Sequence, residues 1–192
     1  MCIRDSLDIV KYGNPVLRQK GERVESINSE ITKLIDDMLE TMQSAHGIGL
    51  AAQQIGQALQ LATVDITGVD DRPSRMEIKS ETVDPEDYMP LILFNPEWTA
   101  VGETTETGPE GCLSFPEIYG DINRPEEIEV KGMYEKGDEM KFRCGGLLSR
   151  AIQHEYDHLH GILFIDRMDG LVRSNLKSDI ESVQAETKKS LA

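Results

Sequence analysis

The sequence predicts an α+β fold in which mixed or antiparallel β-sheets pack around a central helix that contains two histidines, with a further helix near each end of the chain. Apolar residues recur at helical spacing in an early segment, before the histidines, and at the C-terminus. Alternating apolar and polar residues, which indicate half-buried strands, cluster between the first two helical patterns. No regular exchange of strand and helix and no internal repeat is visible, so a parallel sheet is not expected.

The composition is typical of one globular domain. The chain has 192 residues, of which 39% are hydrophobic and 29% are charged, and this length is sufficient for one hydrophobic core. We expect a single domain over residues 7–192. Residues 1–6 show no interpretable pattern, and we expect them to be a non-native or unstructured start.

Charge and cysteine content argue against some classes of protein, namely general nucleic-acid-binding proteins and disulfide-rich secreted proteins. A net charge of −15 argues against a general nucleic-acid-binding surface. Three cysteines do not suggest a disulfide framework, and they favour a reducing compartment such as the cytoplasm. We find no apolar run long enough for a membrane helix and no apolar core of a secretion signal, so we expect no membrane partner.

The first half of the domain begins with a helix. Apolar residues from Ile27 to Met42 follow helical spacing behind Asn28 or Ser29, either of which can cap the helix, and the pattern ends near His46. Two buried strands are expected next. They are separated by an acidic segment with three prolines and no sustained period, which we interpret as a long loop. The two strands and the loop span residues 59–66, 91–94 and 67–90.

The second half contains a hairpin and two helices. Ile128 and Val130 alternate with charged residues, as do Met140, Phe142 and Cys144, around a turn at residues 135–138. Because Cys144 shares its face with Phe142, we expect it to be a core thiol. Gly145 and Gly146 precede the histidine-containing helix. A final helix is expected from an apolar stripe formed by Val172, Leu176, Ile180 and Val183.

Two histidines mark the candidate site. His154 and His158 lie four residues apart, so an α-helix directs both imidazoles to one side, where they can bind a single metal ion. Glu155 points about 100° away and is poorly placed as a third ligand, but it can reach a water molecule held by the ion. It is therefore a candidate base. Leu147 and Ala151 share the face of His154, and we expect them to shape the adjacent pocket.

The third ligand has two candidates. His160 lies on the opposite side of the helix, and Phe164 occupies the place of the third histidine in one zinc protease pattern. Glu181 is a downstream carboxylate of the kind that other zinc peptidases use. Cys112 is stronger, because a thiolate binds zinc or ferrous iron well and a Cys/His/His set leaves a fourth position open, as catalytic sites require.

Three motifs occur in order, and together they resemble the signatures of the peptide deformylase family. Residues 47–56 read GIGLAAQQIG, residues 110–114 read EGCLS, and residues 153–158 read QHEYDH. The similarity runs from about residue 7 to residue 169. Proteins of this family remove the formyl group from the initiator methionine of new bacterial and organellar proteins, so the resemblance implies a bacterial deformylase that releases formate.

The resemblance also implies roles for individual residues. It implies Cys112, His154 and His158 as metal ligands and Glu155 as the proton carrier. Gln54 and the backbone N–H of Leu113 are implied donors to the formyl oxygen. Backbone groups around Ile48, Gly49 and Gly111, with Glu110 beside them, are implied to hold the peptide as an added strand.

The family comparison implies one divalent metal ion, Fe²⁺ in the cell, with Zn²⁺, Ni²⁺ or Co²⁺ as substitutes in preparations. It implies formyl-methionyl nascent peptides as partners and a site of action near the ribosomal exit tunnel. Two other functions stay open at this point. One is a zinc endopeptidase that uses Glu181, in which Cys112 would have no role. The other is a non-catalytic metal-binding module, which would not need Glu155 or Gln54.

Overall fold

The computed structural model describes residues 7–133 and 139–192. The expected start at residues 1–6 and the expected turn at residues 135–138 lie outside the described residues. Every strand pairing within them is antiparallel, so the α+β prediction is confirmed, with antiparallel rather than mixed sheets. No helix of the described part has the length and apolar character that a bilayer crossing requires.

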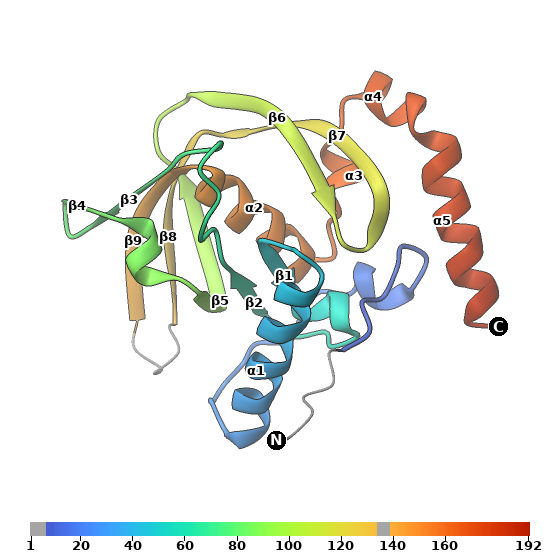
Figure 1. The fold of residues 1–192 in the computed structure, drawn as a ribbon, viewed down its shortest axis with the longest axis horizontal. Coiled ribbons are helices and arrows are strands. Elements are labelled where there is room, and N and C mark those ends of the chain that lie inside the picture. Colours follow the sequence, from blue (N-terminus) through green and yellow to red (C-terminus); the bar gives the residue numbers. More distant parts are fainter. Residues whose placement is uncertain (1–6, 134–138) are drawn as a thin grey trace.

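The strands form two sheets (Figure 1). Seven strands build one sheet in the order β1-β2-β5-β8-β9-β3-β4, and β6 and β7 form a separate two-stranded sheet. Their bounds are β1 Gly49–Ala51, β2 Leu61–Val64, β3 Ser74–Ile78, β4 Glu81–Val83, β5 Leu91–Ala100, β6 Thr105–Cys112, β7 Phe115–Pro125, β8 Glu127–Met133 and β9 Glu139–Gly146.

Five α-helices and three short 3-10 helices occur in the described residues. The α-helices are α1 Ser29–Ser44, α2 Leu147–Leu159, α3 Phe164–Arg167, α4 Gly170–Asn175 and α5 Lys177–Ser190. The 3-10 helices are η1 Pro15–Arg18, η2 Ala52–Ile55 and η3 Pro85–Tyr88.

The predicted N-terminal helix is confirmed as α1. The Asn28 side chain caps it by accepting a hydrogen bond from the Ile31 backbone N–H over 2.9 Å. Ile35, Met38 and Met42 are buried on one face, as the helical spacing predicts.

The predicted C-terminal helix is divided into α4 and α5. Leu176 departs from helical geometry, with φ −93° and ψ 2°, and caps both elements. The apolar stripe nevertheless packs as expected, because Val172, Leu176 and Val183 contact the core cluster in which Ile180 is buried.

The interpretation of residues 67–90 as a loop was wrong. The segment contains β3, β4 and η3, and β3 pairs with β9 so that Met76 lies opposite Cys144. Burial of the Met76 side chain in the main core explains why this segment forms a strand. It anchors β3, whose other side chains are half-buried or exposed. The segment therefore extends the large sheet at its edge.

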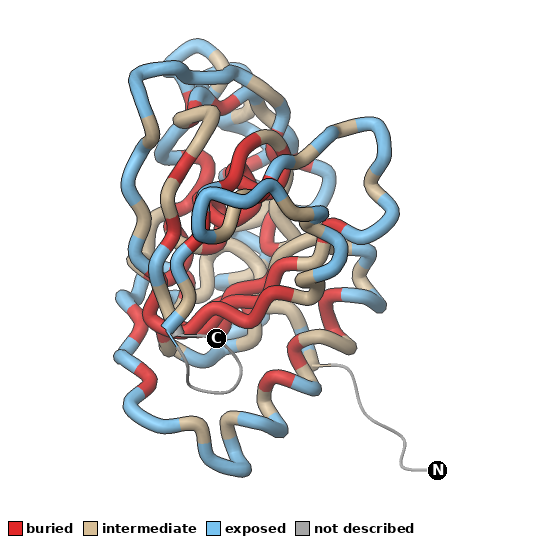
Figure 2. Tube along the Cα trace, turned by 90° about the vertical axis from the view of Figure 1, so that its left-hand side faces the viewer, coloured by how far each residue is buried: buried red, intermediate tan, exposed pale blue. Residues whose placement is uncertain are grey.

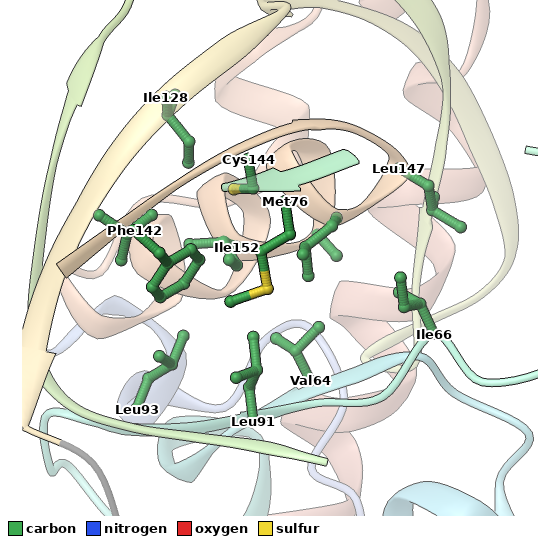
Figure 3. Packing of buried hydrophobic residues seen from close by; sticks show 13 residues of the cluster. Val64, Ile66, Met76, Leu91, Leu93, Ile128, Phe142, Cys144, Leu147 and Ile152 are labelled. Carbon is green, nitrogen blue, oxygen red and sulfur yellow. The ribbon is translucent and has the colours of Figure 1, made fainter. Parts of the chain in front are cut away.

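The main core lies between the two halves of the curved sheet and α2. Figure 3 shows Val64, Leu91 and Leu93 on one side of this core, with Phe142 and Cys144 opposite. The hairpin of β8 and β9 is confirmed, and Cys144 is 1% exposed, as predicted for a core thiol. Burial raises the pKa of this thiol far above its ordinary value, so it stays protonated.

Helix α2 runs through the middle of the molecule, between the large sheet and the hairpin of β6 and β7 (Figure 1). Buried residues concentrate in this central region, whereas exposed residues follow the outer turns (Figure 2). Gly146 caps the start of this helix; its φ is +70°, and its missing Cβ leaves room for the Pro73 carbonyl oxygen. This close contact fixes the start of the helix that carries His154 and His158.

Candidate active site

Two elements bring the predicted metal ligands together. His154 and His158 project from α2, and Cys112 ends β6. One donor atom from each lies within 4.8 Å of the others, and Cys112 Sγ is 3.3 Å from His158 Nε2. Glu181 does not belong to this group. It lies exposed on α5, with its Oε1 atom 3.8 Å from the Lys177 ammonium.

A tight hairpin presents Cys112. The register of β6 and β7 shifts between Gly111 and Cys112, and Cys112 then faces Phe115 across the turn. The Phe115 ring is 1% exposed and stacks on Tyr12, with ring centroids 4.7 Å apart. It also contacts Phe164 edge-on at 5.1 Å. These aromatic contacts hold the turn against the core.

The donor set suits a divalent transition metal, because it combines a soft thiolate with two imidazoles. Burial lowers the pKa of His158 well below its ordinary value, which keeps its ring neutral and able to donate a lone pair. His158 Nδ1 is buried without a hydrogen-bond partner within the described residues. The imidazole is therefore held chiefly by packing and by its contact with Cys112.

His154 is oriented by Glu110. The Nδ1 atom of His154 lies 3.0 Å from Glu110 Oε2. Burial opposes a charge on His154, but hydrogen bonds with Cys112 and Glu110 outweigh it and raise the pKa in the absence of metal. Burial also opposes a charge on Glu110, yet hydrogen bonds from Arg124 and His154 lower its pKa far below the ordinary value. Glu110 is thus an anion that accepts a hydrogen bond from His154.

A buried ionic network surrounds Glu110, and the sequence alone did not reveal it. Arg124 of β7 donates to Glu110 Oε1 at 2.6 Å and to Asp157 Oδ2 at 2.8 Å. Arg150 donates to Glu110 at 2.9 Å and to the Ile122 carbonyl at 2.9 Å. Arg167 closes the network at Asp157 Oδ1 over 2.7 Å.

The position of Arg150 on the histidine face of α2 allows either a side chain that lines the pocket or one that turns outward, and the structure shows the first. Arg150 is 6% exposed, and besides its contact with Glu110 it donates to the Glu106 carbonyl at 2.8 Å. The backbone carbonyls of the hairpin therefore pair with the buried guanidinium. The one usable signal was the position of Arg150 on the histidine face of the helix.

Glu155 occupies the wall opposite β1. It is 4% exposed, its Oε2 atom has no hydrogen-bond partner within the described residues, and burial raises its pKa to about 7 in the absence of metal. A Cβ atom at Gly49 would overlap its carboxylate, so only glycine leaves room for this approach. A carboxyl group with that pKa can exchange a proton near neutral pH.

The two predicted oxygen-binding groups lie next to Cys112. Gln54 Nε2 is 3.5 Å from Cys112 Sγ, and Gln54 Oε1 accepts a hydrogen bond from the Ala51 N–H at 2.9 Å. The Leu113 carbonyl accepts from Lys11 Nζ at 2.7 Å. Val10 N–H also donates to the Gln54 backbone carbonyl at 2.9 Å, so the same N-terminal segment bonds the backbone of both residues.

A cavity of about 460 Å³ joins these groups. Of the site residues predicted from the sequence, all but His158 line the cavity. The predicted residues in the lining are Ile48, Gly49, Gln54, Glu110, Gly111, Cys112, Leu113, Leu147, Ala151, His154 and Glu155. Arg72, which comes from the segment that we had interpreted as a loop, also lines it.

Two strand edges flank the cavity. β1 is an end strand of the large sheet and pairs only with β2, while β6 pairs only with β7 within the described residues. Gly49 and Gly111 lie on these strands and line the cavity. An extended peptide can therefore pair its backbone with either edge.

Comparison with known proteins gives a consistent result. Residues 6–174 match the sequence model of the family described as polypeptide deformylase. The chain is 45% identical over 180 residues to a peptide deformylase of Opitutus terrae, covering 93% of both proteins. It is 44% identical over 172 residues to that of Syntrophobacter fumaroxidans, covering 89% of this chain and 91% of the relative.

Solved structures agree with these sequence matches. A plant peptide deformylase, PDF1B, superposes with a TM-score of 0.83 at 29% identity, over 99% of this chain and 95% of the other. A Synechococcus elongatus peptide deformylase in complex with actinonin gives a TM-score of 0.74 at 36% identity, over 94% of this chain and 85% of the other.

Proposed function

Because the chain belongs to the polypeptide deformylase family, it is a metal-dependent hydrolase, and we propose that the cavity beside α2 is its active site. The enzyme removes the formyl group from the N-terminal formyl-methionine of new proteins and releases formate. One observation carries the assignment to this cavity: a Cys/His/His group and the buried, unpaired carboxylate of Glu155 meet at its wall.

Cys112, His154 and His158 are proposed to hold the metal ion. These residues would hold a divalent cation, which would supply a Lewis acid for activating water and polarising the formyl carbonyl. Sulfur and imidazole ligands suit ferrous iron and zinc alike. We propose Fe²⁺ for the cell, with Zn²⁺, Ni²⁺ or Co²⁺ as substitutes in preparations, while Glu110 keeps the His154 ring in place.

Glu155 is proposed to carry the proton. Its carboxylate takes a proton from the attacking water and later gives it to the methionine nitrogen, which leaves as a free amine. Burial supports this role, because it raises the pKa of Glu155 and so brings the acid and the base forms within reach of neutral pH.

Gln54 and Leu113 are proposed to stabilise the negative charge that develops on the formyl oxygen. The Gln54 side-chain amide and the Leu113 backbone N–H would both donate hydrogen bonds to it. Their support is positional: both residues line the cavity beside Cys112, and the Gln54 amide oxygen is already occupied by Ala51 N–H, which leaves the NH₂ group directed away from that bond.

The peptide is proposed to bind as an added strand. Backbone groups of Ile48, Gly49 and Gly111 would pair with it, and its methionine side chain would lie against Leu147 and Ala151. The carboxylate of Glu110 is already bonded to Arg124, Arg150 and His154, so we assign only the backbone of Glu110 to substrate binding. We treat residues 7–192 as the single domain that carries this site.

Since the substrates are nascent peptides, we propose that the enzyme works in the bacterial cytoplasm, near the ribosomal exit tunnel. Neither alternative function is favoured. Glu181 is exposed and pairs with Lys177, which removes the carboxylate ligand that the peptidase needed. A pure metal-holding module does not account for the burial of Glu155 beside an open cavity.

The direct test is formate release from formyl-Met-Ala-Ser by protein loaded with Fe²⁺ without oxygen. We expect turnover that stops when the metal is removed and returns when it is restored. Cleavage of internal peptide bonds without formate release would instead support the peptidase. Metal binding with neither reaction would support the binding module.

A further inference from the structure

The segment between β2 and β5 contributes Arg72 to the wall of the active-site cavity. Its backbone is held close to the start of α2. The Pro73 carbonyl accepts a hydrogen bond from Leu147 N–H at 3.3 Å, and the Ser74 hydroxyl accepts one from Leu148 N–H at 3.0 Å. The backbone that follows Arg72 is therefore held against the start of α2, near Leu147.

Arg72 differs from Arg75 and Arg150 because it has no carboxylate partner within the described residues. It is half-buried and forms no ion pair or hydrogen bond within residues 7–133 and 139–192. By contrast, Arg75 pairs with Glu126 at 3.0 Å, and Arg150 pairs with Glu110 at 2.9 Å. Asp71 precedes Arg72 but is exposed and does not line the cavity. An unpaired guanidinium at the cavity wall is an available partner for a carboxylate.

The geometry of an extended peptide selects which residue can reach Arg72. Successive side chains of a strand point to opposite sides, so the first and third residues share a side and lie about 7 Å apart along it. If the methionine faces Leu147 and Ala151, the third side chain faces the same wall further along. The second side chain points away from that wall.

We propose that Arg72 is a specificity-determining residue that binds an acidic side chain at the third position of a formyl-methionyl peptide. The inference rests on the proposed function of the cavity and adds a substrate preference to it. It also assigns a role to the segment of residues 67–90, which brings one cation to the active site of a chain whose net charge is −15.

The test compares three amidated peptides, formyl-Met-Ala-Glu, formyl-Met-Ala-Gln and formyl-Met-Ala-Lys, so that no terminal carboxylate competes. We expect kcat/KM of the unaltered enzyme to be about tenfold higher for the Glu peptide than for the Lys peptide, because attraction and repulsion at a partly exposed site each contribute a few-fold. The difference should lie in KM and shrink as salt is added.

Four variants test whether the Arg72 side chain causes the preference. Arg72→Ala should make the Glu and Lys peptides equivalent, Arg72→Glu should reverse the preference, and Arg72→Lys should retain most of it. Arg75→Ala is the matched control, because Arg75 lies on the same segment, is exposed, and does not line this cavity. It should keep the full preference.

The outcomes are separable. An unchanged Glu-to-Lys ratio in Arg72→Ala, or no preference in the unaltered enzyme, would overturn the role of Arg72 while the neutral Gln peptide is still deformylated. An equal or larger Arg72-dependent effect with formyl-Met-Glu-Ala-amide would overturn the assignment to the third position. Failure of every variant and of the unaltered enzyme to deformylate the Gln peptide would instead count against the proposed function.

Discussion

His154 Nδ1 lies 3.0 Å from Glu110 Oε2, on a carboxylate that also accepts hydrogen bonds from two buried guanidinium groups. Glu110 therefore joins β6, which ends in Cys112, to the helix that carries both histidines. Arg124 and Arg150 are 4% and 6% exposed, so their charges are compensated chiefly by this anion and by Asp157. Glu110 therefore belongs both to the surroundings of the proposed metal site and to the buried ionic network.

Replacement of Glu110 by Gln should lower the free energy of unfolding by about 3 kcal/mol, because it leaves buried arginine charges without their anion. Denaturant titration of the metal-free protein measures this. Glu106→Gln is the control, since Glu106 is an exposed neighbour on β6 and should change stability by less than about 0.5 kcal/mol. Equal stability of the two variants would show that the network is not needed for folding.

Cys112→Ala should abolish stoichiometric metal binding, whereas Glu181→Gln should leave it unchanged. Cys112 supplies the only sulfur within the described ligand group, and Glu181 lies exposed beside Lys177. Metal analysis of the two purified variants after dialysis distinguishes them. Loss of metal in the glutamate variant and retention in the cysteine variant would reverse the assignment and revive the peptidase.

Glu155→Gln should reduce kcat by about 10²–10⁴ and still bind the metal, because the amide keeps the size of the side chain and removes the proton carrier. Glu117→Gln is a matched control, since Glu117 lines the same cavity but is exposed. Formate release and metal content are measured together. Near-normal turnover by metal-loaded Glu155→Gln would refute the proposed proton transfer.

The local parts of the structure could be predicted from the sequence. The Asn28 cap and the four-residue spacing of His154 and His158 depend only on residues close together in the chain. The alternation around Phe142 and Cys144 likewise identifies the buried face of one strand. The approach of Cys112 to the two histidines was predictable because its side-chain chemistry completes a ligand set that they leave open.

The features that the sequence did not predict depend on contacts between segments that are far apart in the chain. The strand β3 is short, and the partner that stabilises it, β9, follows about seventy residues later in the chain. The roles of Arg124 and Arg150 arise only when the hairpin folds onto α2, since an arginine in a sequence does not show which carboxylate it meets. Likewise, nothing local distinguishes Leu176, where the last helix is divided.

If the working ion is iron, the enzyme should lose activity in air faster than its zinc-loaded form. A thiolate-bound ferrous centre exposes both the metal and Cys112 to oxidation, whereas zinc has no redox chemistry. Aerobic half-lives of the two loaded forms test this. Cys144→Ala should decay like the unaltered protein, since that thiol is buried and protonated. Equal half-lives for iron and zinc would contradict the prediction.

Formyl-Met-Ala-Ser should be a far better substrate than acetyl-Met-Ala-Ser or formyl-Asp-Ala-Ser. The Glu155 carboxylate packs so closely against Gly49 that no Cβ fits between them, and we expect the extra methyl of an acetyl group to find no room there. Leu147 and Ala151 offer an apolar wall to the first side chain. Burial of methionine there contributes about 1.5–3 kcal/mol, which corresponds to roughly tenfold to hundredfold in kcat/KM.

The two halves of this last prediction are checked separately by measuring formate or acetate release together with KM. Loss of the methionine contact should raise KM and lower kcat/KM, because the side chain binds before and during the reaction. Leu147→Asp should therefore weaken the preference for methionine over aspartate and leave the preference for formyl over acetyl unchanged. Similar efficiencies for all three peptides with the unaltered enzyme would show that neither the wall at Leu147 nor the narrow space at Gly49 selects the substrate.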